Sequence, residues 1–396
     1  MLKKDPPPQL SNSHPFRSAS TGAKVLFAAS VLLLPLLLQI FGNAWVRIAD
    51  FALLYVLLAL GLNIVVGYAG LLDLGYVAFF AVGAYMYALL SSPQLTSAFP
   101  WIAQMFPDGL HTPLYIAIPL SALLAGLFGL ILGAPTLKLR GDYLAIVTLG
   151  FGEIIRVFLN NLDRPVNITN GPKGIGEIDP FTIMGVPLSR KLDLGFTELP
   201  SVTLYYYLFL VLVGFSILIC SRLEHSRIGR AWMAIREDEI AAKAMGINTR
   251  NLKLTAFGMG ATFGGVSGAM FASFQGFVSP ESFSLMESVM IVAMVVLGGI
   301  GYLPGVVLGA LLLAALPEVL RYVAGPLQEM SGGRLDAAIL RQLLIALAMV
   351  SVMLLRPRGL WPSPEHMHTH SHSLLHSHDA LAGAHSSADS KGSAHA

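Results

Sequence analysis

The sequence predicts an all-α, polytopic membrane protein of about ten transmembrane helices with both chain ends in the cytoplasm. Two observations predict this class. Of the 396 residues, 55% are hydrophobic and 12% are charged, whereas ordinary soluble domains carry about 25% charged residues. Long uncharged stretches also recur along the chain, and about 20 apolar residues suffice to cross the hydrocarbon core of a bilayer. The single cysteine, Cys220, excludes an intrachain disulfide framework.

The uncharged stretches place the expected spans. For example, 22 uncharged residues separate Lys24 from Arg47. The apolar sequence after Glu287 is interrupted at residues 301–304, so it is divided into two helices. The ten expected spans are residues 24–41, 48–66, 76–91, 113–133, 142–160, 203–220, 254–276, 286–300, 304–323 and 338–355. Together they form a permease-like membrane domain over residues 24–357.

The distribution of Lys and Arg predicts the orientation. With both ends inside, the cytoplasmic segments hold 16 of these residues and the outer segments hold seven. Cytoplasmic segments of membrane proteins carry such an excess of positive charge. The first apolar stretch begins too late and is too long for a secretory signal, so we expect it to remain as a membrane anchor.

Two polar tails flank the membrane domain. Residues 1–23 are rich in Pro and Ser and are expected to be a disordered cytoplasmic tail. Residues 358–396 form a second cytoplasmic tail, and eight of the eleven histidines follow Pro362. Alternating His can bind divalent metals, but few carboxylates and no cysteine lie nearby. We therefore expect a disordered tail and no metal site.

A polar segment, residues 221–253, separates two long apolar regions. It carries seven Lys and Arg and four acidic residues. No Gly or Pro interrupts residues 231–245, and helix-forming residues dominate there. The pattern predicts one short cytoplasmic helix that ends at Gly246, because Gly is common just past a helix C-terminus. We interpret this helix as a docking surface for a soluble partner; the alternative is a solvated charged face.

A second polar segment, residues 161–202, is expected on the outer side. It is rich in Pro and Gly and balanced in charge. Long segments without clear periodicity are usually functional or disordered. The segment is therefore either part of an external landing surface for a soluble partner or a solvated connector.

Glycines interrupt two apolar stretches, at residues 67–75 and 298–305. Unwound backbone at membrane depth is tolerated where protein covers it or where it lines a wet cavity, and broken helices in both halves of a transporter point to the translocation path. The alternative is a pair of tight turns at the inner surface. The candidate pathway or gate residues are Gly67, Gly70, Asp73, Gly298, Gly299 and Gly301.

Two further patterns predict structure rather than chemistry. Gly260, Gly264, Gly268 and Ala272 are spaced four residues apart, which favours close packing of helices in a membrane. Glu153 and Arg156 lie three residues apart on an expected span. Charge inside a span often marks a functional site, but here a structural ion pair near the outer interface is the preferred interpretation.

Enzymatic chemistry finds no support in the sequence. No HExxH, GxSxG or GxxxxGK[ST] motif is present. No candidate catalytic residue is therefore named, and if ATP powers this protein, another chain must hydrolyse it.

Four stretches resemble the LivM-type permease subunit of branched-chain amino-acid ABC importers. They lie at residues 58–85, 139–161, 229–248 and 294–310, in the order of that family. The resemblance implies a bacterial inner-membrane importer with a sister permease, two cytoplasmic ABC ATPases and a periplasmic amino-acid-binding protein. It also implies Leu, Ile and Val as substrates, membrane lipid around the chain and no nucleic-acid partner. ATP and Mg²⁺ would act in the ATPases, with no cofactor in this chain.

The polar segment also resembles the coupling motif of ABC permeases, in which Glu-Ala-Ala is followed after three residues by Gly. Here Ile240 occupies the position of the motif's Glu, and Glu239 lies one position before it. By this resemblance, the residues expected to couple the chain to an ATPase are Arg236, Glu237, Asp238, Glu239, Ala241, Ala242 and Gly246.

We therefore expect a permease that provides half of the pathway of an ATP-driven importer of branched-chain amino acids. A rival is the same kind of importer carrying urea or short amides, since urea permeases look very similar. A rival of another class is an ion-driven carrier or channel that works alone. A membrane enzyme is a more distant alternative, because no catalytic constellation is present.

Overall fold

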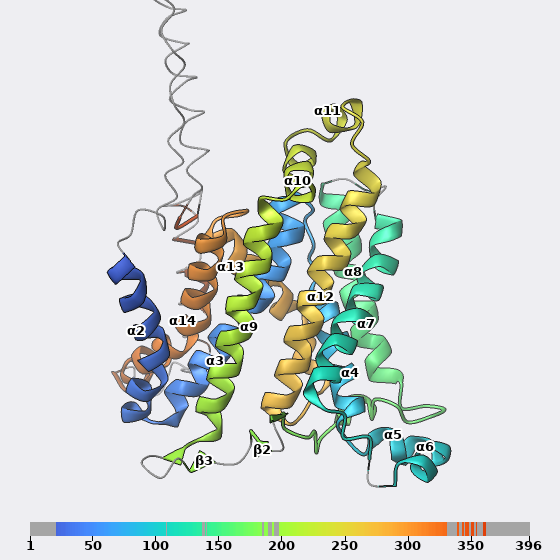
Figure 1. Cartoon of the computed structure of the whole chain (residues 1–396), viewed down its shortest axis with the longest axis vertical. Coiled ribbons are helices and arrows are strands. Elements are labelled where there is room, and N and C mark those ends of the chain that lie inside the picture. Colours follow the sequence, from blue (N-terminus) through green and yellow to red (C-terminus); the bar gives the residue numbers. More distant parts are fainter. Residues whose placement is uncertain are drawn as a thin grey trace, which may run out of the picture.

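The computed structural model describes residues 21–107, 109–136, 139, 141–183, 186–188, 192–193, 198–330 and 359–361, with eight single positions between 339 and 354. Within these residues the protein is a bundle of long, roughly parallel and antiparallel helices (Figure 1). Most of the two polar tails, and most of the tenth expected span, lie outside the described residues. The first described helix begins at Thr21, so residues 21–23 of the expected amino-terminal tail are helical.

The described helices follow one another along the chain, with the longest connection between Asn161 and Ser201. The α-helices are α2 (Thr21–Phe41), α3 (Asn43–Asn63), α4 (Val77–Leu90), α5 (Gln94–Ala98), α6 (Pro100–Met105), α7 (Leu114–Thr136), α8 (Asp142–Asn161), α9 (Ser201–Glu224), α10 (Arg227–Glu237), α11 (Glu239–Ala244), α12 (Thr249–Gln275), α13 (Leu285–Gly298) and α14 (Leu303–Met330). A π-helical turn, η1 (Ile64–Tyr68), continues α3, and two 3-10 turns are η2 (Gly171–Lys173) and η3 (Pro280–Phe283).

Four two-residue strands complete the described elements. They form two antiparallel hairpins, β1 (Thr182–Ile183) with β2 (Val186–Pro187), and β3 (Leu192–Asp193) with β4 (Glu198–Leu199). Both hairpins lie in the outer segment, so the strands do not alter the all-helical class of the membrane domain.

Nine of the expected spans coincide with described helices. Four of these helices are long and apolar enough to cross a bilayer by length and composition, namely Asn43–Tyr68, Tyr115–Thr136, Ser201–Glu224 and Leu303–Leu320. This supports the predicted polytopic membrane protein. Helix α12 begins five residues before its expected span, because the side chain of Asn248 caps it by accepting a hydrogen bond from Asn251 N at 3.2 Å.

The predicted stripe of small residues packs α12 against its neighbours. A Cβ atom on Gly268 would lie 2.2 Å from the backbone oxygen of Phe80 on α4, and one on Gly260 would lie 2.5 Å from Val65. A Cβ atom on Gly264 would lie 3.0 Å from the Cβ of Phe79. Without side chains at these positions the helix backbones can approach closely, which is how helices associate in lipid. The packing interpretation of the stripe is confirmed.

The two polar segments lie at opposite ends of the bundle. Figure 1 shows α10 and α11 at one end, and α5, α6 and the hairpins at the other. The expected topology requires this separation, because one segment is assigned to the cytoplasm and the other to the outside.

Candidate functional site

The polar segment folds as two helices rather than the single helix expected over residues 231–245. The chain is extended at Asp238 (φ −154°, ψ 108°), between α10 and α11. The carboxylate of Asp238 accepts hydrogen bonds from the backbone N–H groups of Ile240 at 2.8 Å and Ala241 at 3.0 Å. Asp is among the preferred N-cap residues, so it starts a new helix here. Gly246 follows the second helix with φ +83°, as expected.

Helix α10 is anchored firmly to the bundle. The side chain of Trp232 is fully buried, and its Nε1 donates a hydrogen bond to the backbone oxygen of Leu252 on α12 at 2.7 Å. Ser226 caps the helix by accepting a hydrogen bond from Gly229 N at 3.1 Å. Helix α10 is therefore joined directly to α12.

The outward surface of this unit is mixed in character. Glu237, Ile240, Ala241, Ala244 and Met245 are all exposed, and we call this set the docking face. Its two large apolar side chains are strongly exposed, Ile240 at 70% and Met245 at 83%. Exposed apolar side chains gathered in a patch mark interaction sites.

Two of the predicted coupling residues on α11, Glu239 and Ala242, instead face the bundle. Ala242 is buried. Glu239 forms an ion pair with Lys253 at 2.8 Å, and Lys253 is itself buried on α12. These residues hold α11 onto α12 and contribute little to the docking face.

Arg236 reaches inward to both glycine breaks. Its Nη1 donates a hydrogen bond to the backbone oxygen of Gly67 at 2.6 Å. A Cβ atom on Gly301 would lie 2.5 Å from the same nitrogen, and one on Gly70 would lie 2.9 Å from Arg236 Cγ. Asn63 closes the group, because its Oδ1 accepts a hydrogen bond from Gly301 N at 3.0 Å. We call these five residues the arginine junction; the structure brings together coupling and gate residues that the sequence predicted separately.

The first break, after Gly67, is unwound chain inside the bundle. The π-helical turn ends at Tyr68 and the next helix begins at Val77. Residues 69–75, which we call the extended segment, run between these points. The segment starts beside the end of α13, and by Leu74 it has reached Ser288, ten residues earlier on that helix. At 1.5 Å per residue, it spans about 15 Å along the bundle.

Side chains from neighbouring helices satisfy the backbone of the extended segment. Leu74 N donates to the Oγ1 of Thr148 on α8 at 3.0 Å, and Ser288 Oγ on α13 donates to Leu74 O at 2.6 Å. Asp73 Oδ1 accepts from Gly75 N at 2.9 Å, within the segment itself. Unwound backbone at this depth needs such partners, because no bulk water is available to replace them.

The second break is a tight turn. Helix α13 ends at Gly298, and Tyr302 N donates to Gly299 O at 3.2 Å to close the turn before α14. Gly299 and Gly301 both have positive φ, 119° and 82°. A Cβ atom on Gly298 would lie 2.3 Å from the oxygen of Gly305, so the two helices touch directly. The second break is therefore a tight turn, whereas the first is unwound chain inside the bundle. That the first break lines the translocation path stays a prediction.

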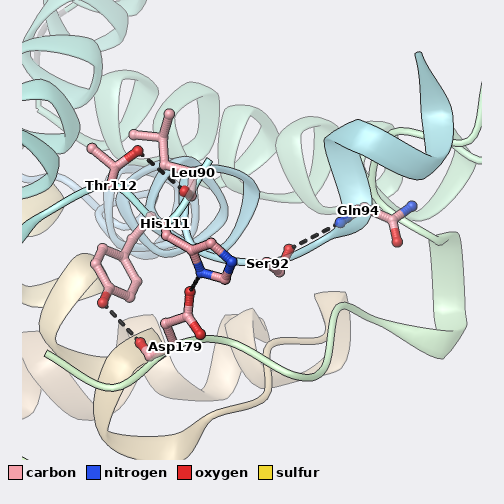
Figure 2. A network of polar contacts seen from close by, with 7 residues as sticks. Leu90, Ser92, Gln94, His111, Thr112 and Asp179 are labelled. Atoms are coloured by element: carbon pink, nitrogen blue, oxygen red, sulfur yellow. Dashed lines mark hydrogen bonds and ion pairs between the residues drawn. The ribbon is translucent and has the colours of Figure 1, made fainter. Parts of the chain in front are cut away.

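The outer segment is tied to the helix ends over much of its described length. Figure 2 shows His111 pointing at Asp179, with Nδ1 and Oδ2 2.5 Å apart. The backbone of Asp179 is also held, since its oxygen accepts from Tyr87 Oη at 2.9 Å and its nitrogen donates to Ser91 O at 2.8 Å. Next to it, the buried ring of Phe181 packs 4.9 Å from that of Tyr87. The described part of residues 161–202 is thus folded onto the bundle.

The expected ion pair on α8 forms. Arg156 Nη2 lies 3.0 Å from Glu153 Oε2, and Arg156 Nη1 lies 3.5 Å from Glu281 Oε2 just before α13. The pair is therefore part of a three-residue group that joins α8 to η3. Within the described part of the chain no group of three His, Cys, Asp or Glu is placed to hold a metal ion, and the His-rich tail lies outside that part.

The sequence analysis missed three polar residues that hold the breaks, namely Asn63, Thr148 and Ser288. Each is a polar residue within an expected apolar span. Polar side chains within membrane helices tend to bond to other helices, so this signal was present. It does not reveal the partner, because the partner in each case is backbone from a distant part of the chain.

Comparison with known proteins places the chain among transport permeases. A family model described as "Branched-chain amino acid transport system / permease component" matches residues 45–353. The chain is 39% identical over 361 residues to the high-affinity branched-chain amino acid transport system permease protein LivM of Escherichia coli (strain K12), covering 88% of this chain and 77% of the relative.

More relatives carry similar names. The LivM protein of Salmonella typhimurium is 41% identical over 329 residues, which cover 80% of this chain and 70% of that protein. The LivH permease protein of the same organism is 25% identical over 317 residues, which cover 78% of this chain and 92% of that protein. No solved structure matches this chain.

Proposed function

The chain belongs to the family of branched-chain amino acid transport system permease components, and from this membership we propose that it forms half of the transmembrane pathway of an ATP-driven importer for leucine, isoleucine and valine. Its relatives are named as permeases for these substrates. The resemblance noted in the sequence is thereby confirmed, and the family consists of transport permeases rather than enzymes.

The complete importer would contain several other chains. We expect a sister permease, two cytoplasmic ABC ATPases that use ATP and Mg²⁺, and a periplasmic amino-acid-binding protein, in the bacterial inner membrane. Ten spans with both termini in the cytoplasm would put the docking face on the side of the ATPases. The outer segment, held by Tyr87 and His111, would then help to receive the binding protein.

The observation that carries the coupling proposal is the hydrogen bond from Arg236 to Gly67. ATPases that close on ATP would press on the docking face. Because α10 is anchored through Trp232, the movement would reach the arginine junction and shift the extended segment relative to the turn at Gly299. Alternating access requires such a connection between the site of the force and the wall of the path.

The proposal is tested by purifying the chain in mild detergent from its native membrane and identifying the subunits bound to it. The complex and the isolated chain are then reconstituted separately into vesicles with radioactive leucine. We expect the complex to accumulate leucine with ATP, and the isolated chain to be inactive. Accumulation by the isolated chain would instead indicate an ion-driven carrier.

Substrate class is tested in the same vesicles by competition. Unlabelled isoleucine and valine should reduce leucine uptake, whereas urea in the same excess should not. Inhibition by urea and short amides but not by isoleucine would move the chain to the urea-importer class.

A further inference from the structure

The extended segment presents alternate residues to opposite sides. Leu71 and Asp73 are buried in the bundle, at 7% and 1% exposure, whereas Gly70 and Leu72 are exposed and Leu74 is half-buried. Extended chain directs successive side chains to opposite faces. One edge of the segment therefore packs into the protein, and the other edge, formed by Gly70, Leu72 and Leu74, faces out of this subunit.

Lipid is a poor cover for this outward edge. Irregular backbone within the span of a membrane protein occurs where other protein or a water-filled cavity lies against it. Leu74 is held between Thr148 of α8 and Ser288 of α13, so the edge lies in the space between these two helices. Its neighbours must therefore be compatible with water or with another subunit.

The charges on α8 lie on the same side. Arg156 bonds to Glu281, just before α13, so the pair with Glu153 is on the face of α8 that is turned toward α13. The side chains of Glu153 and Arg156 remain 34% and 30% exposed. Charged residues within membrane spans face the bundle interior or a wet cavity. The unwound chain and the partly exposed ion pair thus lie on the same face of the subunit.

We propose that the outward edge of the extended segment lines the translocation pathway, with Leu72 and Leu74 as the surface over which the aliphatic side chain of the solute passes. The proposal rests on the proposed function and names the wall of that pathway. Asp73 is on the opposite, buried edge and bonds to Gly75 N. It is therefore a positioning residue that shapes the segment, and it does not meet the amino group of the solute.

The arrangement also explains how the wall would move. Gly67 lies in the π-helical turn just before the segment, and Arg236 of α10 bonds to its backbone oxygen. A displacement of α10 pulls on one end of the segment while Thr148 and Ser288 hold the other end. Leu72 lies between these two fixed points, so its position relative to the path would depend on the state of the ATPases.

Cysteine accessibility in the assembled importer tests the proposal. Cys220, the single cysteine of the sequence, is first replaced by Ser, and then Leu72→Cys, Leu74→Cys and Leu123→Cys are made one at a time. Leu123 is the matched control, because it is an exposed leucine on the regular helix α7. Each complex is reconstituted in vesicles and treated with a charged, water-soluble methanethiosulfonate.

A thiol reacts with such a reagent only where water lets it ionise, so we expect Leu72→Cys and Leu74→Cys to react at least about tenfold faster than Leu123→Cys. Saturating leucine should slow the reaction at Leu72→Cys, and the modification should block uptake. Equal rates at positions 72 and 123, or fast modification that leaves uptake unchanged, would overturn the proposal. If neither the parent complex nor the Cys220→Ser complex accumulates leucine, the proposed function fails. If both complexes accumulate leucine, the labelling rates alone decide whether the extended segment lines the pathway.

Discussion

The two glycine-rich breaks look alike in sequence and differ in structure. Residues 69–75 form unwound chain that spans about 15 Å along the bundle. Residues 298–302 form a tight turn between α13 and α14. Both contribute to the arginine junction, where Arg236 bonds to Gly67 and lies against Gly301.

The difference shows what glycines indicate in this protein. At both breaks a glycine marks the place where another backbone comes close, Thr148 O near Gly75 and Gly305 O near Gly298. Whether the chain unwinds or turns depends instead on the partners available to its backbone groups. The first break has side-chain partners from α8 and α13 for its free backbone groups, and this allows the chain to stay unwound.

The largest expected effect comes from filling the close contacts of both breaks. In Gly75→Ala the new Cβ would lie 2.0 Å from Thr148 O, and in Gly298→Ala 2.3 Å from Gly305 O. These are backbone atoms that cannot move aside, and overpacking of this kind costs about 1–3 kcal/mol. We expect both variants to lower the yield of folded complex, measured by size-exclusion chromatography in detergent.

Gly214→Ala is the control for these two variants, because nothing lies within 4 Å of a Cβ atom at that position on α9. Its yield should equal that of the parent protein. A normal yield for Gly75→Ala would show that the extended segment is not packed on α8.

Arg236→Ala should separate ATP hydrolysis from uptake, because it removes the group that contacts both breaks. A hydrogen bond from a charged donor contributes about 1.5–3 kcal/mol, so leucine uptake per ATP should fall roughly tenfold or more. Arg236→Lys should recover part of the loss. The control is Arg230→Ala on the same helix, whose Nη1 donates a hydrogen bond to the backbone oxygen of His225 at the end of α9, at 2.8 Å. Unchanged uptake in Arg236→Ala would remove the junction from the coupling path.

Removing the side chain that bonds to the backbone of the extended segment should affect the first break alone. Thr148→Val keeps the shape of the side chain but leaves Leu74 N unpaired, at a cost of about 1–2 kcal/mol. We expect a lower thermal midpoint for the purified complex and faster labelling of Leu72→Cys. Thr262→Val is the control, because the hydroxyl of Thr262 bonds to Met259 O of its own helix. Equal midpoints for the two variants would show that the backbone of the segment is satisfied in another way.

The smallest effect is expected at the turn. Gly301 has φ +82°, which costs an L-residue about 1–2 kcal/mol. The atom that a Cβ would meet is the movable end of Arg236, so Gly301→Ala should be milder than Gly75→Ala. In the Arg236→Ala background, Gly301→Ala should reduce stability by even less. Thermal midpoints of the four proteins in a double-mutant cycle measure this difference. A larger loss of stability from Gly301→Ala in the Arg236→Ala background would contradict the contact between Gly301 and Arg236.

Part of the candidate site was visible in the sequence. The C-terminal Gly246 of the polar segment and the small-residue stripe of α12 depend on local composition and spacing, and the structure agrees with both. The docking role of the polar segment stays a prediction. The single helix expected over residues 231–245 was wrong, since Asp238 satisfies two backbone donors more favourably as a cap than within a continuous helix. Its helix-ending role was not evident from the run of helix-forming residues around it.

The sequence by itself determined the helical membrane class, the positions of nine helices and the family, because apolar length, charge spacing and local motifs are properties of neighbouring residues. The tertiary structure alone decided that Arg236 bonds to Gly67, that one break is extended and the other a turn, and that Asp73 faces inward. These outcomes depend on which distant backbone groups need a partner once water is excluded. That requirement arises only when helices far apart in the chain are brought side by side.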